Sequence, residues 1–260
     1  MKIEKNDRLI LLTNDDGLYA EGLNTLIEVM QSFGKVVVIS TIDSRSGMSQ
    51  ALTVKMPIRV KLLKETETKR IYACSGTPTD GVKIAINQLL ERKPDWVVSG
   101  INHGANASVS VIYSGTMAAA IEGCLYGVDS VGFSLNNFSS KADFSHTRRY
   151  VKNIMEMLAK NKLPKGICLN VNIPSAESEI RGIKICRQAR GNWQEEFEKR
   201  KDPAGKSYYW LTGIFQNHEP ESEDTDEWAL SNNYVSVVPV SVDLTAHGYI
   251  EELKNQISDV

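Results

Sequence analysis

The chain alternates short, almost wholly apolar runs with longer segments whose apolar residues recur every three or four positions. Runs of the first kind are typical of strands buried on both faces of a parallel sheet, and segments of the second kind are typical of helices with one buried face. The alternation therefore predicts an α/β fold, with a mainly parallel sheet and crossover helices on both of its faces.

The periodicity locates the main elements along the chain. We expect strands at 9–13, 35–40, 94–102, 131–134, 167–171 and 234–242, and helices at 20–33, 77–93, 115–126 and 145–161. Thr79 is the expected N-cap of the second helix. Between 54 and 72 the pattern loosens, which indicates short strands or a hairpin with its turn at 64–69.

The order of elements changes beyond Pro174, where charged and aromatic residues replace the regular alternation. We expect one domain over 1–260, with a core at about 1–175 and an extension at about 176–260 that carries a β-hairpin arm. The aromatic side chains of the extension could stack a base or line a subunit interface, and their charged neighbours favour the interface. These side chains are Trp193, Tyr208, Tyr209, Trp210 and Phe215.

An acidic run from Glu219 to Glu227 could be a metal-binding cluster or a solvated loop. Its density of like charge, together with Pro220 and Ser222, favours the loop.

Composition limits the class of partner and the compartment. The formal net charge of -2 gives no electrostatic reason to expect a nucleic acid polymer or an anionic membrane as partner. The four cysteines are widely spaced within apolar segments, which is typical of buried thiols rather than of disulfides or a zinc site. There is neither a signal-peptide pattern nor an apolar run of about 18 residues, so we expect a cytoplasmic protein.

Polar, glycine-containing loops follow three of the expected strands. Asp15 and Asp16 come directly after the first strand, Ser46 follows the second, and Asn102 ends the strand at 94–102. Ligands of open parallel sheets bind outside the carboxyl ends of the strands, so these side chains are expected to converge.

Two adjacent carboxylates repel each other and lose hydration at a strand end, so keeping both ionised requires positive charge nearby. A divalent cation supplies that charge, and hydroxyl and amide oxygens from Ser46 and Asn102 would complete a set suited to Mg²⁺ or Mn²⁺. The alternative is that one aspartate caps the following helix and the other is solvated.

The first of these loops is not a known phosphate cradle. Gly17 and Gly22 have the spacing of a P-loop, but Leu23 and Asn24 stand where its Lys and Ser or Thr would be. A second candidate anion site lies at Ser114, Gly115 and Thr116, which precede an alanine-rich helix whose free N–H groups favour a phosphate. An ordinary helix cap is the alternative there.

Taken together, six blocks in order resemble the SurE family of nucleotidases, from Leu9 to about Gly248. The blocks are LLTNDDG with AEGL, SRSGMSQALT, SGTPTDGV, VVSGINHGAN, VIYSGTMAAAIEG and YVSVVPVSVDLTAH.

The resemblance implies a Rossmann-like three-layer fold, a homodimer or homotetramer assembled through the C-terminal extension, and one Mg²⁺ or Mn²⁺ per subunit. It implies release of phosphate from nucleoside 5′- and 3′-monophosphates, and from short polyphosphate, by a metal-activated water. By motif match, the metal ligands are Asp15, Asp16, Ser46 and Asn102, and the phosphate contacts are Asn106, Ser114, Gly115 and Thr116.

Two positions depart from the family pattern. Ser40 and Thr41 stand in place of Ala-Pro, which is expected to affect the loop that carries Ser46. Asn233 stands in place of a Gly, and Asn tolerates the left-handed backbone that such a Gly supplies.

In the expected mechanism Asp15 and Asp16 are the catalytic pair, and Asp16 either binds the metal or also accepts the proton of the water. His103 and His247 are expected to be structural or merely near the site rather than catalytic. The rival functions are a non-catalytic nucleotide-binding or metal-binding regulatory module and a metal-dependent nucleotide-sugar transferase.

Overall fold

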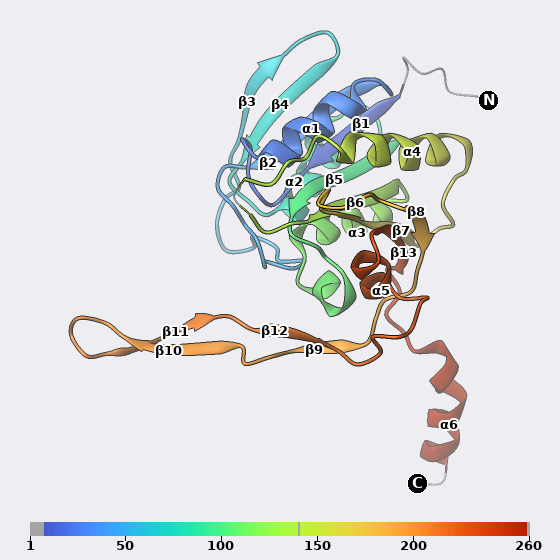
Figure 1. Ribbon diagram of the computed structural model, residues 1–260. Helices are drawn as coiled ribbons and strands as arrows, with labels where there is room; N and C mark the ends of the chain where they lie inside the picture. Colours follow the sequence, from blue (N-terminus) through green and yellow to red (C-terminus); the bar gives the residue numbers. More distant parts are fainter. Residues whose placement is uncertain (1–7, 140, 259–260) are drawn as a thin grey trace.

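The computed structural model describes residues 8–139 and 141–258, and a nine-stranded sheet forms its centre. Six strands run parallel in the spatial order β4-β2-β1-β5-β6-β7 (Figure 1). They are β1 (Leu9–Thr13), β2 (Lys35–Thr41), β4 (Lys69–Cys74), β5 (Trp96–His103), β6 (Asp129–Asn136) and β7 (Ile167–Pro174). The central residues of all of these strands except β4 are buried, as continuous apolar runs predict, while β4 is only partly buried before its last two residues.

The outer strands have mixed directions. On one side β3 (Val60–Glu65) is antiparallel to β4. On the other side β13 (Tyr234–Ser241) is antiparallel to β7, and β8 (Gly182–Ile185) runs parallel to β13. The C-terminal extension therefore returns two strands to the central sheet.

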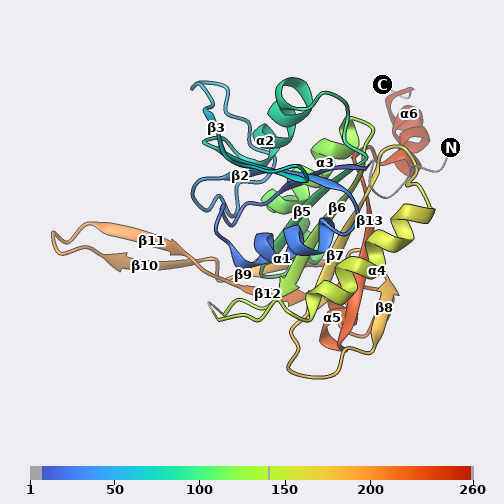
Figure 2. The same ribbon diagram turned by 90° about the horizontal axis from the view of Figure 1, so that it is seen from above.

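Helices cover both faces of the sheet (Figure 2). α1 (Glu21–Met30) and α4 (Thr147–Lys160) pack on one face, where their apolar side chains join the larger core. α2 (Pro78–Ile84), which continues into the π-helix η2 (Ala85–Leu89), packs with α3 (Gly115–Leu125) on the other face. The predicted Rossmann-like three-layer sandwich is confirmed.

The start of α2 differs from the expectation, because Thr77 and not Thr79 is its N-cap. The Thr77 hydroxyl accepts a hydrogen bond from the N–H of Asp80, and the Asp80 carboxylate accepts one from the N–H of Thr77. Pro78 occupies the first helical position, where its missing N–H costs nothing, and this sets the start of the helix one residue after Thr77.

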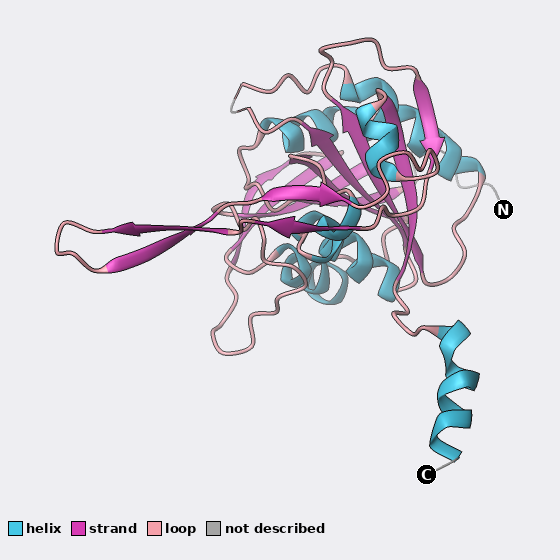
Figure 3. Ribbon diagram, turned by 60° about the horizontal axis from the view of Figure 1, so that its bottom comes forward, coloured by secondary structure: helices cyan, strands magenta, loops and turns pink. Residues whose placement is uncertain are grey.

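The extension forms a long arm that projects from the sandwich (Figures 1 and 3). Its two halves are β9 (Gly191–Gln194) with β12 (Ile214–Asn217), and β10 (Phe197–Lys201) with β11 (Ser207–Leu211). The 3₁₀ turn η4 (His247–Tyr249) leads to α6 (Ile250–Ser258), which stands apart from the sheet (Figure 3).

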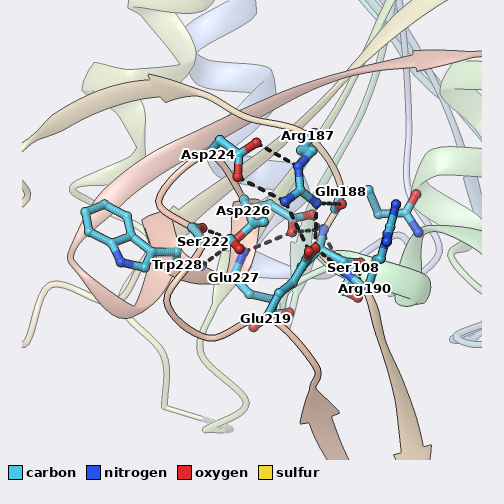
Figure 4. Close-up of polar contacts among 12 residues, drawn as sticks. Ser108, Arg187, Gln188, Arg190, Glu219, Ser222, Asp224, Asp226, Glu227 and Trp228 are labelled. Atoms are coloured by element: carbon cyan, nitrogen blue, oxygen red, sulfur yellow. Dashed lines mark hydrogen bonds and ion pairs between the residues drawn. The ribbon is translucent and has the colours of Figure 1, made fainter.

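The acidic run at 219–227 is a loop as far as Thr225, with Glu221, Glu223 and Asp224 exposed, as predicted, but its last two residues depart from that prediction. Its last two residues begin α5 (Asp226–Ser231), with Thr225 as N-cap, and Asp226 is buried. Upstream, Glu219 and Asp224 both form ion pairs with Arg187, at 2.5 and 2.7 Å (Figure 4). A cation and a helix N-terminus within the fold offset the negative charge that the sequence alone leaves exposed.

All four cysteines are free and buried, as predicted. Within 8–139 and 141–258, none of the helices combines the length and apolarity that crossing a bilayer requires.

Candidate functional site

The predicted site residues lie around the carboxyl ends of β1, β2 and β5, which are neighbours in the sheet. Asp15 and Asp16 follow β1, Ser46 lies in the loop after β2, and Asn102 is the penultimate residue of β5. β1 is flanked by β2 on one side and β5 on the other, so the two aspartates lie between the other candidate ligands.

Asp15 joins the predicted metal site to the start of α3. Its side chain is buried, with the residue 3% exposed, and its Oδ1 accepts a hydrogen bond of 2.5 Å from the Thr116 hydroxyl. Its Oδ2 lies so close to Gly115 that a Cβ added there would be 2.8 Å from that oxygen. Only glycine at 115 lets the helix start approach the carboxylate this closely.

Asp16 bonds to the end of β5. Its Oδ2 accepts a hydrogen bond of 2.9 Å from the backbone N–H of His103. The His103 ring contacts the carbonyl oxygen of Ser139, with Nε2 at 2.5 Å from it, so the histidine serves the site through its backbone.

Asn102 is buried, and its amide is oriented by its own loop. Its Nδ2 donates to the carbonyl oxygen of Gly104 at 2.7 Å, while its Oδ1 accepts no hydrogen bond from the part of the chain that the structure describes. β5 changes register against β6 just before Asn102, and Gly100 makes this possible, with φ of 119° and no space for a Cβ beside the Phe133 carbonyl.

The loop that carries Ser46 connects the loop of the two aspartates to the segment just before α3. The N–H of Arg45 donates to the Asp15 carbonyl at 2.7 Å, and Ser49 bonds to the carbonyl oxygens of Ile112 and Tyr113, just before α3. The Ser46 hydroxyl itself is exposed and lies 3.0 Å from that of Ser44. The backbone beside Ser46 thus reaches Asp15, while its side chain bonds within the loop.

The pKa values of both aspartates are raised above their ordinary value. Burial raises the pKa of Asp15 to about 6, more than the Thr116 hydroxyl lowers it, and the charge of Asp16 raises it further. Burial also raises the pKa of Asp16, against the lowering effect of the His103 N–H. Among the described residues no Lys or Arg forms an ion pair with either carboxylate. A buried carboxylate, a partly buried one and the Asn102 amide oxygen fit a hard divalent cation.

The predicted phosphate contacts already have partners in the fold. The Ser114 hydroxyl accepts from the Met117 N–H as the N-cap of α3, and the Thr116 hydroxyl donates to Asp15. Asn106 donates its Nδ2 to Ser134 at 2.8 Å. The Thr116 N–H also acts on the Asp15 carboxylate, so an anion at this point would meet chiefly the N–H of Gly115 at the start of α3.

Sequence reasoning missed Asp226, whose carboxylate connects the site to the extension (Figure 4). Its Oδ2 accepts from the N–H of Ser108 at 2.8 Å, and its Oδ1 accepts from the N–H of Ala189 at 2.9 Å. The Ser108 hydroxyl donates to the Ala189 carbonyl at 2.9 Å. These bonds tie the segment between β5 and α3 to the base of the arm. The signal that could have found Asp226 is the cap residue Thr225 before it, which the surrounding acids obscured.

A second missed residue is Asn14, which holds the loop of the two aspartates. Its Nδ2 donates to the Gly17 carbonyl at 3.0 Å, and its Oδ1 accepts from the Ser40 hydroxyl at 2.7 Å. Ser40, one of the residues that depart from the family pattern, thus helps to hold the loop of the two aspartates. Asn233 has a φ of 60°, the left-handed conformation expected for it.

Two clefts are relevant to the choice of site. One of about 320 Å³ adjoins the Ser46 loop. A larger one of about 480 Å³ lies at the opposite edge of the sheet, near the amino ends of β1 and β2, and includes Arg8 and Lys35. Ligands of parallel sheets bind at the carboxyl ends, so the candidate site is the edge that carries Asp15 and Asp16.

Comparison with known proteins identifies the same fold and family. Residues 10–195 match the family described as Survival protein SurE. The chain is 52% identical over 256 residues to a protein of Christiangramia forsetii named 5'-nucleotidase SurE, covering 97% of this chain and 98% of that protein. A second protein of that name, from Flavobacterium johnsoniae, is 52% identical over 255 residues, covering 97% of each chain.

The crystal structure of the SurE protein from Aquifex aeolicus has a TM-score of 0.81 at 35% identity, covering 95% of this chain and 99% of that one. Fold, ordered motifs and near full-length similarity agree, and the chain belongs to the SurE family.

Proposed function

We propose that the protein is a divalent-metal-dependent nucleotidase that hydrolyses nucleoside monophosphates to nucleosides and phosphate. The observation that carries this proposal is the contact between buried Asp15 and the start of α3, because neither Asp15 nor Asp16 pairs with a Lys or Arg among the described residues. The name 5'-nucleotidase SurE of relatives up to 52% identical supports it.

The residues that would hold the cation are Asp15, Asp16, Ser46 and Asn102, and Mg²⁺ or Mn²⁺ suits their oxygens. When bound, the cation supplies positive charge that makes a water more acidic and offsets negative charge on the phosphate. Ser46, whose hydroxyl contacts that of Ser44, would have to exchange this contact for one with the cation.

The chain's own groups bind and orient the phosphate. The N–H groups of Gly115 and Thr116 lie in the first turn of α3, where the helix dipole favours an anion. The Thr116 N–H also acts on the Asp15 carboxylate, so in this proposal it is shared between that carboxylate and the phosphate. Asn106 and Ser114 lie on the same segment and complete the proposed phosphate contacts. Phosphoryl transfer needs chiefly positioning and charge stabilisation, which these groups provide.

Asp16 is the better proposed proton acceptor of the pair. It is less buried than Asp15, and the bond from the His103 N–H leaves its second carboxylate oxygen available. Asp15 has its Oδ1 held by Thr116, which suits a fixed ligand. We propose hydrolysis of both 5′- and 3′-monophosphates, and of short polyphosphate.

The exposed aromatic side chains of the arm support a proposed role in assembly as a homodimer or homotetramer. Tyr209 and Trp210 are both more than half exposed on β11. Light scattering of the chain with and without 196–212 measures this role separately from catalysis.

The rival is a binding module without catalysis. Phosphate release from AMP with Mn²⁺, its loss on chelation and its recovery on adding metal would support the nucleotidase. AMP binding without phosphate release would support the module, and transfer of the phosphoryl or sugar group to an added sugar would support a transferase.

A further inference from the structure

The cleft of about 320 Å³ is lined on one side by Arg45 and Met48, which lie before and after Ser46 in the sequence. The segment 52–56 forms its opposite wall, and residues 75–77 complete it. The N–H of Arg45 donates to the backbone carbonyl of Asp15, so one residue that lines the cleft is joined to the loop of the two aspartates.

The lining combines apolar side chains with positive charge. Met48, Leu52 and Met56 are 40%, 48% and 71% exposed, an unusual concentration of exposed apolar surface beside a polar site. Arg45 and Lys55 are the charged side chains among the described residues that line the cleft, and both are cations. A flat, weakly polar ring attached to an anion has the complementary chemistry.

The far wall is fixed to the body of the protein. The Ala51 carbonyl accepts a hydrogen bond of 2.7 Å from the Thr77 hydroxyl, and the N–H of Thr53 lies 3.2 Å from each carboxylate oxygen of Asp80. Asp80 is itself held in the capping box of α2. The cleft is therefore formed before any ligand enters, which lowers the entropic cost of binding.

The near wall reaches the proposed phosphate position. Ser49 bonds to the carbonyl oxygens of Ile112 and Tyr113, immediately before the N-cap Ser114 of α3. A group attached to a phosphate at the start of α3 thus has this loop and its cleft as its neighbour.

We infer that this cleft is the subsite for the base of the nucleoside monophosphate, an inference that rests on the proposed function. The base lies between the apolar side chains, and Arg45 and Lys55 face the anionic side of the ligand. Methionine side chains adapt to rings of different shape. Purine and pyrimidine monophosphates are consequently bound with similar affinity.

The test compares AMP with ribose 5-phosphate, which keeps the sugar and phosphate but lacks the base. The double variant Leu52→Ala with Met56→Ala removes apolar contacts of the base alone. We expect KM for AMP to rise about five- to tenfold, with kcat little changed and KM for ribose 5-phosphate within about twofold of the wild type.

Leu63→Ala is the matched control, because Leu63 is 43% exposed, close to Leu52, and lies outside the cleft. An equal change for both substrates, or no change for AMP, would overturn the subsite. So would a changed molecular mass in light scattering with an unaltered ratio of KM values, which would identify the cleft as a contact between copies of the chain.

If the wild type releases phosphate from neither substrate, the proposed nucleotidase fails while the subsite stays testable. Calorimetry of AMP and ribose 5-phosphate binding, with Mn²⁺ present, then decides it: weaker binding of AMP alone in the double variant supports the subsite, and unchanged AMP binding refutes it.

Discussion

The hydroxyl of Thr116 donates a hydrogen bond of 2.5 Å to Oδ1 of Asp15, a residue 101 positions earlier in the chain. The bond joins the end of β1 to the first turn of α3, so the proposed metal ligand and the proposed phosphate-binding helix move as one unit. It also favours the ionised carboxylate, which burial otherwise disfavours.

Thr116→Val is expected to lower kcat/KM for AMP by about tenfold or more, because the valine keeps the shape and removes a hydrogen bond to a charged group. Affinity for Mn²⁺ should weaken as well, since Asp15 loses the group that orients it. Steady-state phosphate release and Mn²⁺ titration measure both effects. Thr116→Ser keeps the hydroxyl and should remain near wild type; equal loss in both variants would mean that the methyl group, not the bond, matters.

Asp15→Asn is expected to reduce activity by about two to three orders of magnitude through loss of the charge that holds the cation. Thermal unfolding gives a readout independent of activity. Millimolar Mn²⁺ should raise the melting temperature of the wild type, because the ion binds the folded chain, and should leave that of the variant unchanged. An equal rise in both proteins would place the cation elsewhere.

Asp226→Asn should both destabilise the protein and impair phosphate binding. Asn offers one acceptor where the carboxylate offers two, so either the N–H of Ser108 or that of Ala189 loses its partner, at a cost of about 1–3 kcal/mol. Urea unfolding and the inhibition constant of inorganic phosphate measure the two effects.

Asp224→Asn is the control for Asp226, because it changes the same charge two residues away. Asp224 bonds to exposed Arg187 and makes no bond to Ser108. It should destabilise the protein less and leave phosphate inhibition unchanged. If the two variants behaved alike, the acidity of the segment rather than the Ser108 bond would be responsible.

Glu227→Gln is expected to stabilise the protein above about pH 4.5, with the full gain reached above about pH 7. Burial, and then the charge of Asp226, raises the pKa of Glu227 to about 7 from 4.5. Because the folded-state pKa is raised, its contribution to stability is fully present below about pH 4.5 and is lost as pH rises through 7.

The glutamine should therefore gain about 1–2 kcal/mol at pH 8.5, a discounted value because the side chain is only half-buried, and nothing at pH 4. Urea unfolding at the two pH values measures the gain. A variant that was equally stabilised at pH 4 would show that packing, and not ionisation, is the cause.

The sheet and the site edge could be predicted because their signals are local. The run Leu9–Thr13 is apolar throughout, and the amphipathic segment that follows it ends near Gly34, so a strand and a helix follow from neighbouring residues alone. Parallel strands then put Asp15 and Asn102 at one edge without further information.

The bonds that hold the site could not be predicted, because they join distant residues. Nothing near Thr116 indicates Asp15, and Ser108 is 118 positions from Asp226. Such pairs depend on how α3 and α5 pack, and packing is decided by the whole chain. Local charge was misleading for Asp226, because Glu221, Glu223 and Asp224 before it are exposed while its own carboxylate is buried.

The order of synthesis has a consequence for β13. This strand pairs with β7 over Ser236–Ser241. Asp226 lies eight residues before Tyr234, the first residue of β13. A growing chain that has left the ribosome only as far as residue 195 has β7 as an open edge and Ser108 without its acceptor. The strands that carry Asp15, Asp16 and Asn102 are therefore made before the partner of β7 and the acceptor of the Ser108 N–H, and we expect a nascent chain to gain its proposed activity only after residue 241 has left the ribosome.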